Sequence, residues 1–161
     1  MATTYKLGME AVIKYQTPAL ADPSTLNPAS AGGMTELSNV RDVTINHQTG
    51  EADVTTRANQ GWRATAATLR ECSVDFQMVW KPNDAGFEAI KNAWINGSEI
   101  SMAFLSDDPA QSGAEGPCGN FSITNFSRSE ALEEAIVVDV TAKLSAWGKW
   151  YSAGSSGSGG S

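Results

Sequence analysis

The stretch that decides the fold runs from Leu37 to Trp62 and reads LSNVRDVTINHQTGEADVTTRANQGW. It contains two β-prone runs, Val40–Asn46 and Glu51–Arg57, which are followed by polar connections at His47–Gly50 and Ala58–Gly61. Thr, Val and Ile favour an extended backbone, whereas Asn and Gly supply turn conformations. Acidic, Thr and Arg side chains alternate along the second run, so one of its faces must meet something other than an apolar core. We interpret this stretch as an assembly element that lines water or touches a neighbouring copy.

Further strands are predicted on both sides of this stretch. Alternation from Tyr5 to Tyr15 predicts a half-buried strand with Met9, Ala11 and Ile13 on one side. Other strands are predicted around Ile100–Phe104, from Phe121 onward and over Ile136–Leu144, before an aromatic segment at Trp147, Trp150 and Tyr151. The clearest alternation lies in Arg63–Trp80, where one face carries Cys72, Val74, Phe76, Met78 and Trp80 and the other carries Glu71, Ser73, Asp75 and Gln77.

One helix is predicted after Pro82, with Asn83 or Asp84 as its N-terminal cap. Phe87, Ile90 and Trp94 recur at helical spacing, and Gly97 is placed to end the helix. Two segments are predicted as loops, the Pro-rich Thr17–Met34 and the turn-rich Asp107–Gly119.

About seven strands and one amphipathic helix predict a mainly β fold, a sandwich or barrel of antiparallel strands flanked by the helix. At 161 residues the length predicts one domain, here residues 1–152, followed by a flexible Gly/Ser tail at 153–161. No internal repeat of solenoid length is visible.

Composition argues against some classes of function. The formal charge of −7 and pI near 4.6 argue against a surface that grips phosphate backbones, which needs clustered Lys and Arg. The sequence shows neither a signal pattern nor an apolar run of membrane-spanning length.

Cys72 and Cys118 lack metal-ligand spacing; Cys72 is expected as a buried thiol, and Cys118 falls in a predicted loop. A disulfide between them stays open, and a reducing cytoplasm fits best.

The search for catalytic or cofactor chemistry finds no candidate, so no cofactor, metal or enzymatic activity is expected. His47 is the only histidine and has no partners at a matching spacing. Asp107, Asp108 and Glu115 share a segment but do not match a calcium loop. No serine lies on a strained turn of the kind a nucleophile needs.

Several phrases together resemble the major tail tube proteins of long-tailed bacteriophages and prophages. The resemblance covers about Lys6–Leu144 and rests on VRDVT at Val40, EADVTTR at Glu51, GWR at Gly61 and VVDVTAK at Val137, together with the order of the elements. It implies two packed antiparallel sheets flanked by a helix. It also implies homohexameric rings that stack into a β-lined tube in the virion tail, assembled in the bacterial cytoplasm. The partners it implies are other copies, a tape-measure protein, a tail-terminator protein and DNA that passes without sequence-specific binding.

Two groups of site residues follow from these patterns. The first group is expected at subunit and ring contacts: His47, Gln48, Thr49, Glu51, Asn59, Gln60 and Trp62. The second is expected to face the lumen: Asp53, Thr55, Arg57, Glu71, Ser73, Asp75 and Gln77. We expect a mostly acidic lumen, because DNA carries one negative charge per about 1.7 Å and a basic wall would bind it.

Three alternatives stay open at this stage. The first is a secretion-system tube protein, which shares the architecture. The second is a monomeric β-sandwich that binds carbohydrate or acts as an adhesin, for which Trp62 would be the exposed aromatic platform. The third is a small hydrolase, which the lone histidine and the missing constellations disfavour.

Overall fold

The computed structural model describes residues 8–29 and 33–153. Their strands are β1 (Val12–Gln16), β2 (Thr35–Glu36), β3 (Val40–Asp53), β4 (Thr65–Val79), β5 (Glu99–Leu105), β6 (Glu115–Ser129) and β7 (Val137–Ser152). One α-helix, α1 (Ala85–Asn96), lies between β4 and β5, and short 3-10 turns occupy Gly8–Glu10, Pro23–Thr25 and Arg57–Asn59. The predicted strand start at Tyr5–Leu7 and the tail from residue 154 lie outside the described residues.

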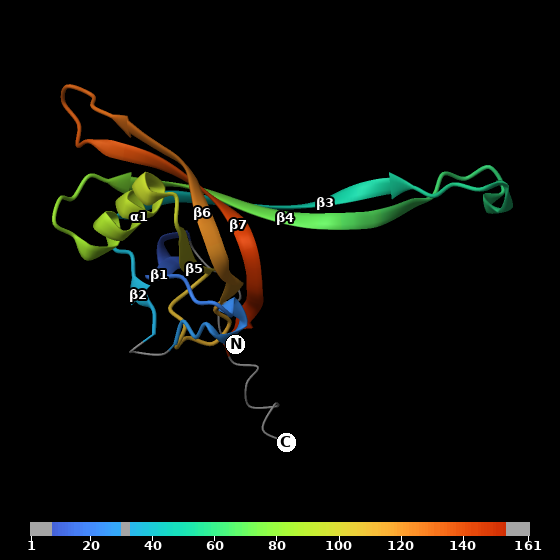
Figure 1. Cartoon of the computed structure of the whole chain (residues 1–161), viewed down its shortest axis with the longest axis horizontal. Coiled ribbons are helices and arrows are strands. Elements are labelled where there is room, and N and C mark those ends of the chain that lie inside the picture. Colours follow the sequence, from blue (N-terminus) through green and yellow to red (C-terminus); the bar gives the residue numbers. More distant parts are fainter. Residues whose placement is uncertain (1–7, 30–32, 154–161) are drawn as a thin grey trace, which may run out of the picture.

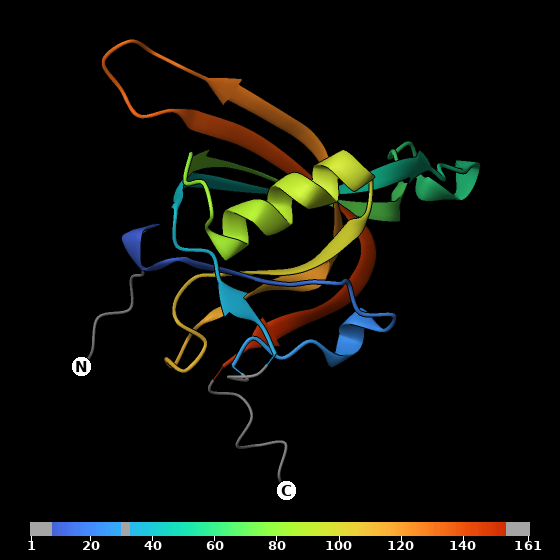
Figure 2. The ribbon, with the colours of Figure 1, turned by 60° about the vertical axis from the view of Figure 1, so that its left-hand side comes forward.

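All seven strands belong to one antiparallel sheet in the order β2-β1-β5-β6-β7-β4-β3. The sheet folds over on itself, so that β4 and β3 lie across β1 and β5 (Figures 1 and 2). Phe76 of β4 and Phe104 of β5 contact each other, with ring centroids 6.3 Å apart, although their strands are not neighbours in the sheet. The predicted mainly β fold of two packed layers is confirmed, with both layers drawn from one continuous sheet.

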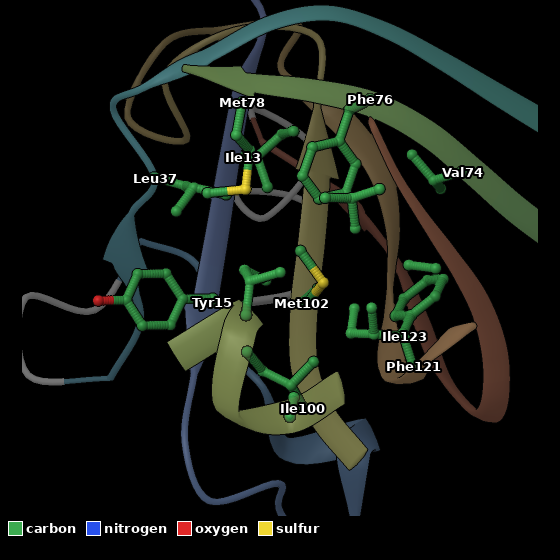
Figure 3. Close-up of a cluster of buried hydrophobic side chains, with 14 of the residues drawn as sticks. Ile13, Tyr15, Leu37, Val74, Phe76, Met78, Ile100, Met102, Phe121 and Ile123 are labelled. Carbon is green, nitrogen blue, oxygen red and sulfur yellow. The ribbon is translucent and has the colours of Figure 1, made fainter. Parts of the chain in front are cut away.

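The core fills the space between the two layers. Val74, Phe76 and Met78 of β4 point toward Ile100 and Met102 of β5 (Figure 3). The intervening residues of β4 are exposed or half-buried, as the alternation over Arg63–Trp80 predicts. Burying a side chain of this size stabilises the fold by about 1.5–3 kcal/mol.

Helix α1 begins and ends where the sequence predicts. The side chain of Asp84 accepts a hydrogen bond from the backbone N–H of Phe87, and Gly97 has the left-handed φ of 66° typical of a helix C-terminus. Phe87 is buried against Trp80 and Phe126, with ring centroids 4.8 and 6.1 Å away. The helix therefore closes one open side of the folded sheet.

Several local predictions are wrong. His47–Gly50 is no connection, because β3 runs unbroken from Val40 to Asp53 with a register shift between Thr49 and Glu51. The predicted strand Glu51–Arg57 ends at Asp53. Met9 lies in a 3-10 turn and is 88% exposed, so it does not share the buried side of Ile13. Cys118 lies buried within β6, and the aromatic segment at Trp147–Tyr151 is the second half of β7.

Candidate assembly surfaces

A polar wall covers the outer face of β6, β7, β4 and β3. Backbone register aligns Thr44, Asp75, Thr141 and Asn125 in one row across the four strands. The Thr141 hydroxyl donates to Asp75 Oδ1 at 2.7 Å. We define the polar wall as Asp42, Thr44, Asn46, Glu71, Ser73, Asp75, Gln77, Asn125, Asp139, Thr141 and Lys143, which carry four carboxylates against one ammonium group, a formal −3 per copy.

Two strand edges border the polar wall. Within the described residues, β3 pairs only with β4, so its other edge is free along its length. Strand β6 pairs with β5 only as far as Ser122, and no other described strand covers the outer edge of residues 124–129. Unpaired strand edges are ready to pair with another chain, and folded proteins rarely leave long ones uncovered.

The hairpin of β3 and β4 extends far beyond the body of the protein (Figure 1). From Gln48 to Glu71 nearly every residue is exposed, so the hairpin has no core of its own. Its tip is nevertheless ordered by local hydrogen bonds. Asp53 Oδ1 accepts from the N–H of Thr55 at 2.9 Å, and the Thr55 hydroxyl accepts from the N–H of Ala64 at 2.8 Å. Hydrogen bonds from Thr55 lower the pKa of Asp53; the bond from the Thr55 side chain has the larger effect and the bond from its N–H the smaller.

The tip has a distinct chemistry. Residues 54–64 carry Arg57 and Arg63 and no acidic residue, in a chain whose formal charge is −7. Trp62 projects from the tip with 77% of its surface exposed. A long two-stranded ribbon is marginally stable in water by itself. The hairpin thus combines an exposed tryptophan with the absence of a core of its own among the described residues.

The structure sorts the predicted site residues into two places. All seven predicted contact residues lie on the hairpin, from His47 near its root to Trp62 at its tip. The predicted lumen residues divide: Glu71, Ser73, Asp75 and Gln77 lie on the polar wall, whereas Asp53, Thr55 and Arg57 lie at the far end of the hairpin. Sequence reasoning missed the wall residues Asp42, Asn125 and Asp139 as parts of one surface. Only the strand register brings them together.

A cavity of about 430 Å³ lies at the hairpin root, where β4 leaves β7. His47 and Trp150 approach across it, with ring centroids 5.8 Å apart, and Cys72 and Trp147 also line it. The residues that the structure describes include no group of three or more His, Cys, Asp or Glu side chains that could hold a metal ion. Both cysteines are free thiols, and burial raises the pKa of Cys118 to about 11.

The Pro-rich segment Thr17–Met34 packs on the body in its described parts. Leu26 and Met34 are buried with Leu105 and Cys118. The buried pair Ser101 and Asn120 holds Leu20 from both sides: the Leu20 N–H donates to Ser101 Oγ at 3.0 Å, and Asn120 Nδ2 donates to the Leu20 carbonyl at 2.8 Å. The described parts of the segment therefore pack on the face of β5 and β6 that points away from the main core.

Comparison with known proteins identifies the family. Residues 25–149 match the family described as phage tail tube protein. The chain belongs to this family. Within the described part of this tail tube protein, no helix is long and apolar enough to cross a membrane.

Solved structures share the fold of this tail tube protein. The tail of an empty gene transfer agent particle, refined with C6 symmetry, has a TM-score of 0.65 at 18% identity and covers 92% of this chain and 98% of its own. The virion of a native gene transfer agent gives 0.66 at 16% identity, with the same coverage. The SPP1 tail tube gives 0.63 at 17% identity and covers 87% of this chain and 76% of its own. No curated protein sequence matches this chain.

Proposed function

We propose that six copies of this tail tube protein close into a ring, and that stacked rings form a tube whose polar wall faces a channel for DNA. One observation carries the proposal: a water-facing, acidic section of four strands is bordered by a free edge on each side. C6 symmetry in the tail of a gene transfer agent of the same fold supports the number six.

Strand direction favours ring closure through these edges. Strands β6, β7, β4 and β3 alternate in direction, so the first and the last of the four run opposite ways. The β3 edge of one copy therefore meets the β6 edge of the next in antiparallel orientation, and the alternation continues around the ring. Such a head-to-tail contact closes when the rotation per copy divides a full turn. It also removes both exposed edges.

The negative charge of the polar wall favours a channel that DNA passes through rather than a surface that binds DNA. The polar wall carries a formal −3 per copy, so six copies would line each ring with about −18. Duplex DNA carries one negative charge per about 1.7 Å, and a wall of the same sign avoids the phosphate contacts that produce non-specific binding. We infer that Glu71, Ser73, Asp75 and Gln77 face this lumen.

The hairpin supports contact between rings. Its tip is basic and carries the exposed Trp62, whereas the rest of the chain is acidic. We assign His47, Gln48, Thr49, Glu51, Asn59, Gln60 and Trp62 to this contact, together with Asp53, Thr55 and Arg57 where the tip reaches the channel. Assembly in the host cytoplasm on a tape-measure protein, ended by a terminator protein, completes the proposal.

Electron microscopy of the purified protein over a range of salt and protein concentrations tests the proposal. We expect hollow tubes or six-fold rings. Trp62→Ser should reduce tube length while rings remain. Leu132→Ser is the matched control, because Leu132 is fully exposed outside the hairpin and should leave tubes unchanged. A wild-type protein that stays monomeric under every condition would contradict the proposal.

A further inference from the structure

The last turn of α1 carries an apolar patch beside the free edge of β6. Trp94 and Ile95 are 46% and 59% exposed, whereas Phe87, Ile90 and Ala93 of the same helix are buried. The Trp94 ring stacks on that of Phe126, with centroids 6.0 Å apart and an interplanar angle of 20°. Phe126 lies in the part of β6 that β5 does not cover. We call Trp94, Ile95 and Phe126 the helix patch.

A cleft with both apolar and polar lining lies beside the free edge of β3, at the other border of the polar wall. It has a volume of about 500 Å³ and opens between β3 and the chain around β1. Ile45 lines it and is 38% exposed, although its cross-strand partner Val74 is fully buried. Ile45 therefore lies on the core side of the sheet, but the described residues place no core above it. Met9, Ile13, Val43, Ile45 and Leu105 form its apolar lining, of which Met9 and Ile45 are exposed, and the charged side chains Glu36, Arg41 and Asp42 also line it. We call this opening the β3 cleft.

The helix patch and the β3 cleft lie on the same side of the sheet. Val43 and Ile45 pair with Phe76 and Val74, whose side chains form the core. Phe126 pairs with Val140, which is also in the core. Val43, Ile45 and Phe126 thus lie on the side opposite the polar wall, at its two borders, and Asp42 of the wall also lines the cleft. Directly opposite side chains on one face of an antiparallel strand pair lie about 4.5–5.5 Å apart. Pairing of the β6 edge of one copy with the β3 edge of another would therefore bring the helix patch close to the β3 cleft.

We propose that the helix patch of one copy fills the β3 cleft of the next copy in the ring. This inference rests on the proposed ring, in which the β6 edge of one copy joins the β3 edge of its neighbour. The occupant is a second copy because both features flank the two edges that this joint would bring together. The contact is head-to-tail, so every copy donates one helix patch and receives one.

This arrangement explains exposed side chains that the isolated chain leaves uncovered. Trp and Met are enriched at the buried centres of protein interfaces, and apolar surface of this kind contributes about 25 cal/mol per Å² when removed from water. The polar wall and the helix patch then have separate roles: the wall faces water and the patch holds the ring closed. Ring stability would depend on residues that never face the channel.

Site-specific crosslinking within assembled tubes tests the contact. Ile45→Cys/Ile95→Cys protein is assembled and treated with a short bis-maleimide, and products are separated under denaturing conditions. We expect a ladder of covalent oligomers that ends at the hexamer. The two single variants are the controls and should give no ladder, because native Cys72 and Cys118 are buried.

A second variant tests the energetic role of the helix patch. Ile95→Lys places a charge at the contact but leaves the buried side of α1 intact, so the thermal midpoint of the monomer should not change. We expect tube formation to need a roughly tenfold higher protein concentration, because lysine replaces apolar contact at the joint and its charge is costly to remove from water. Leu132→Lys adds the same charge elsewhere and should assemble like the wild type.

The outcomes separate this inference from the proposed function. Wild-type tubes without a ladder in the double variant, and with Ile95→Lys assembling at the wild-type concentration, would overturn the patch-and-cleft contact and leave the tube intact. Failure of the wild type to form any ring or tube would overturn both.

Discussion

In the proposed tube, reversing the charge of the polar wall should turn a channel that DNA passes into one that binds DNA. Glu71 and Asp75 are exposed and lie on the same face of β4. Glu71→Gln/Asp75→Asn changes the wall from −3 to −1 per copy, and Glu71→Lys/Asp75→Lys changes it to +1. In a six-copy ring these values become about −18, −6 and +6, on a surface where charges interact over a Debye length of about 10 Å.

The magnitude follows from counterion release. A ring with six net positive charges that contact phosphates gives a slope of about −5 for log K against log salt concentration. DNA binding should therefore weaken by about a thousandfold between 50 and 200 mM salt. The wild-type wall and the neutralised wall should show no retention of this kind, because neither carries net positive charge.

The assay assembles tubes of each variant with a labelled short DNA duplex, pellets the tubes and measures bound DNA along a salt series. Asp75→Asn keeps a side-chain oxygen that can accept from the Thr141 hydroxyl, whereas Asp75→Lys loses this bond. The thermal midpoint of each monomer is therefore measured first, and only tubes assembled from folded protein are compared. Equal DNA retention by wild-type and lysine tubes would refute the assignment of this face to the channel. Lysine variants that fold but never assemble would place these side chains at a subunit contact instead.

Three further predictions concern the monomer. Phe87→Ala should lower the free energy of unfolding in urea by about 3–5 kcal/mol, because Phe87 is 1% exposed beneath Trp80 and Phe126, whereas Leu132→Ala should change it by less than about 0.5 kcal/mol. The Cys118 thiol, with its pKa raised to about 11 by burial, should resist alkylation at pH 8 until the protein unfolds, and rapid labelling of the native protein, followed by mass spectrometry, would contradict this. Because the pKa of Asp53 is lowered in the folded protein, its carboxylate stabilises the tip at pH values above the unfolded pKa near 4, and this effect is lost as the pH falls through the lower folded pKa. The protection of the Thr55 N–H against hydrogen exchange in Asp53→Asn should therefore match its protection in the acidified wild type. Unchanged protection in the variant would count against the tip structure.

The sequence predicts the elements in which one face is buried. Strand β4 and helix α1 follow their hydrophobic periods, and Asp84 and Gly97 mark the ends of α1. Each of these signals is local, since it depends on residues a few positions apart. The alternation of Glu71–Gln77 also predicts which side of β4 is polar, and the structure places this side on the polar wall.

The failed predictions have two physical causes. His47–Gly50 looks like a turn because both faces of the distal β3 strand are exposed, so no hydrophobic period distinguishes strand from turn. The Gly- and Pro-rich segment before Phe121 looks like a loop, but its glycines serve close packing inside β6. A Cβ at Gly116 would lie 1.6 Å from the carbonyl oxygen of Phe104, and one at Gly119 would lie 2.6 Å from that of Ala146. Glycine there permits two backbones to approach, which a single sequence cannot distinguish from a bend.

The surfaces proposed for assembly cannot be recognised in the sequence for a related reason. The wall residues come from four strands whose spatial order, β6-β7-β4-β3, reverses and skips the chain order. Asp139 becomes a neighbour of Gln77 and Ser127 only after the register is known. Trp94 and Ile45 each look like a core residue in the sequence, and only the coordinates show that each is exposed at a border of the wall.

Where local sequence rules fail in this protein, the failure itself carries information about function. A strand that meets water on both faces, an apolar side chain on the core side without a core, and a tryptophan at a hairpin tip each conflict with the rules for a self-sufficient monomer. These three conflicts lie on the hairpin and in the β3 cleft. A single kind of partner, another copy of the same chain, would satisfy all three at once. A monomeric binding module would need only one such surface, so the distribution of these conflicts favours a repeating assembly.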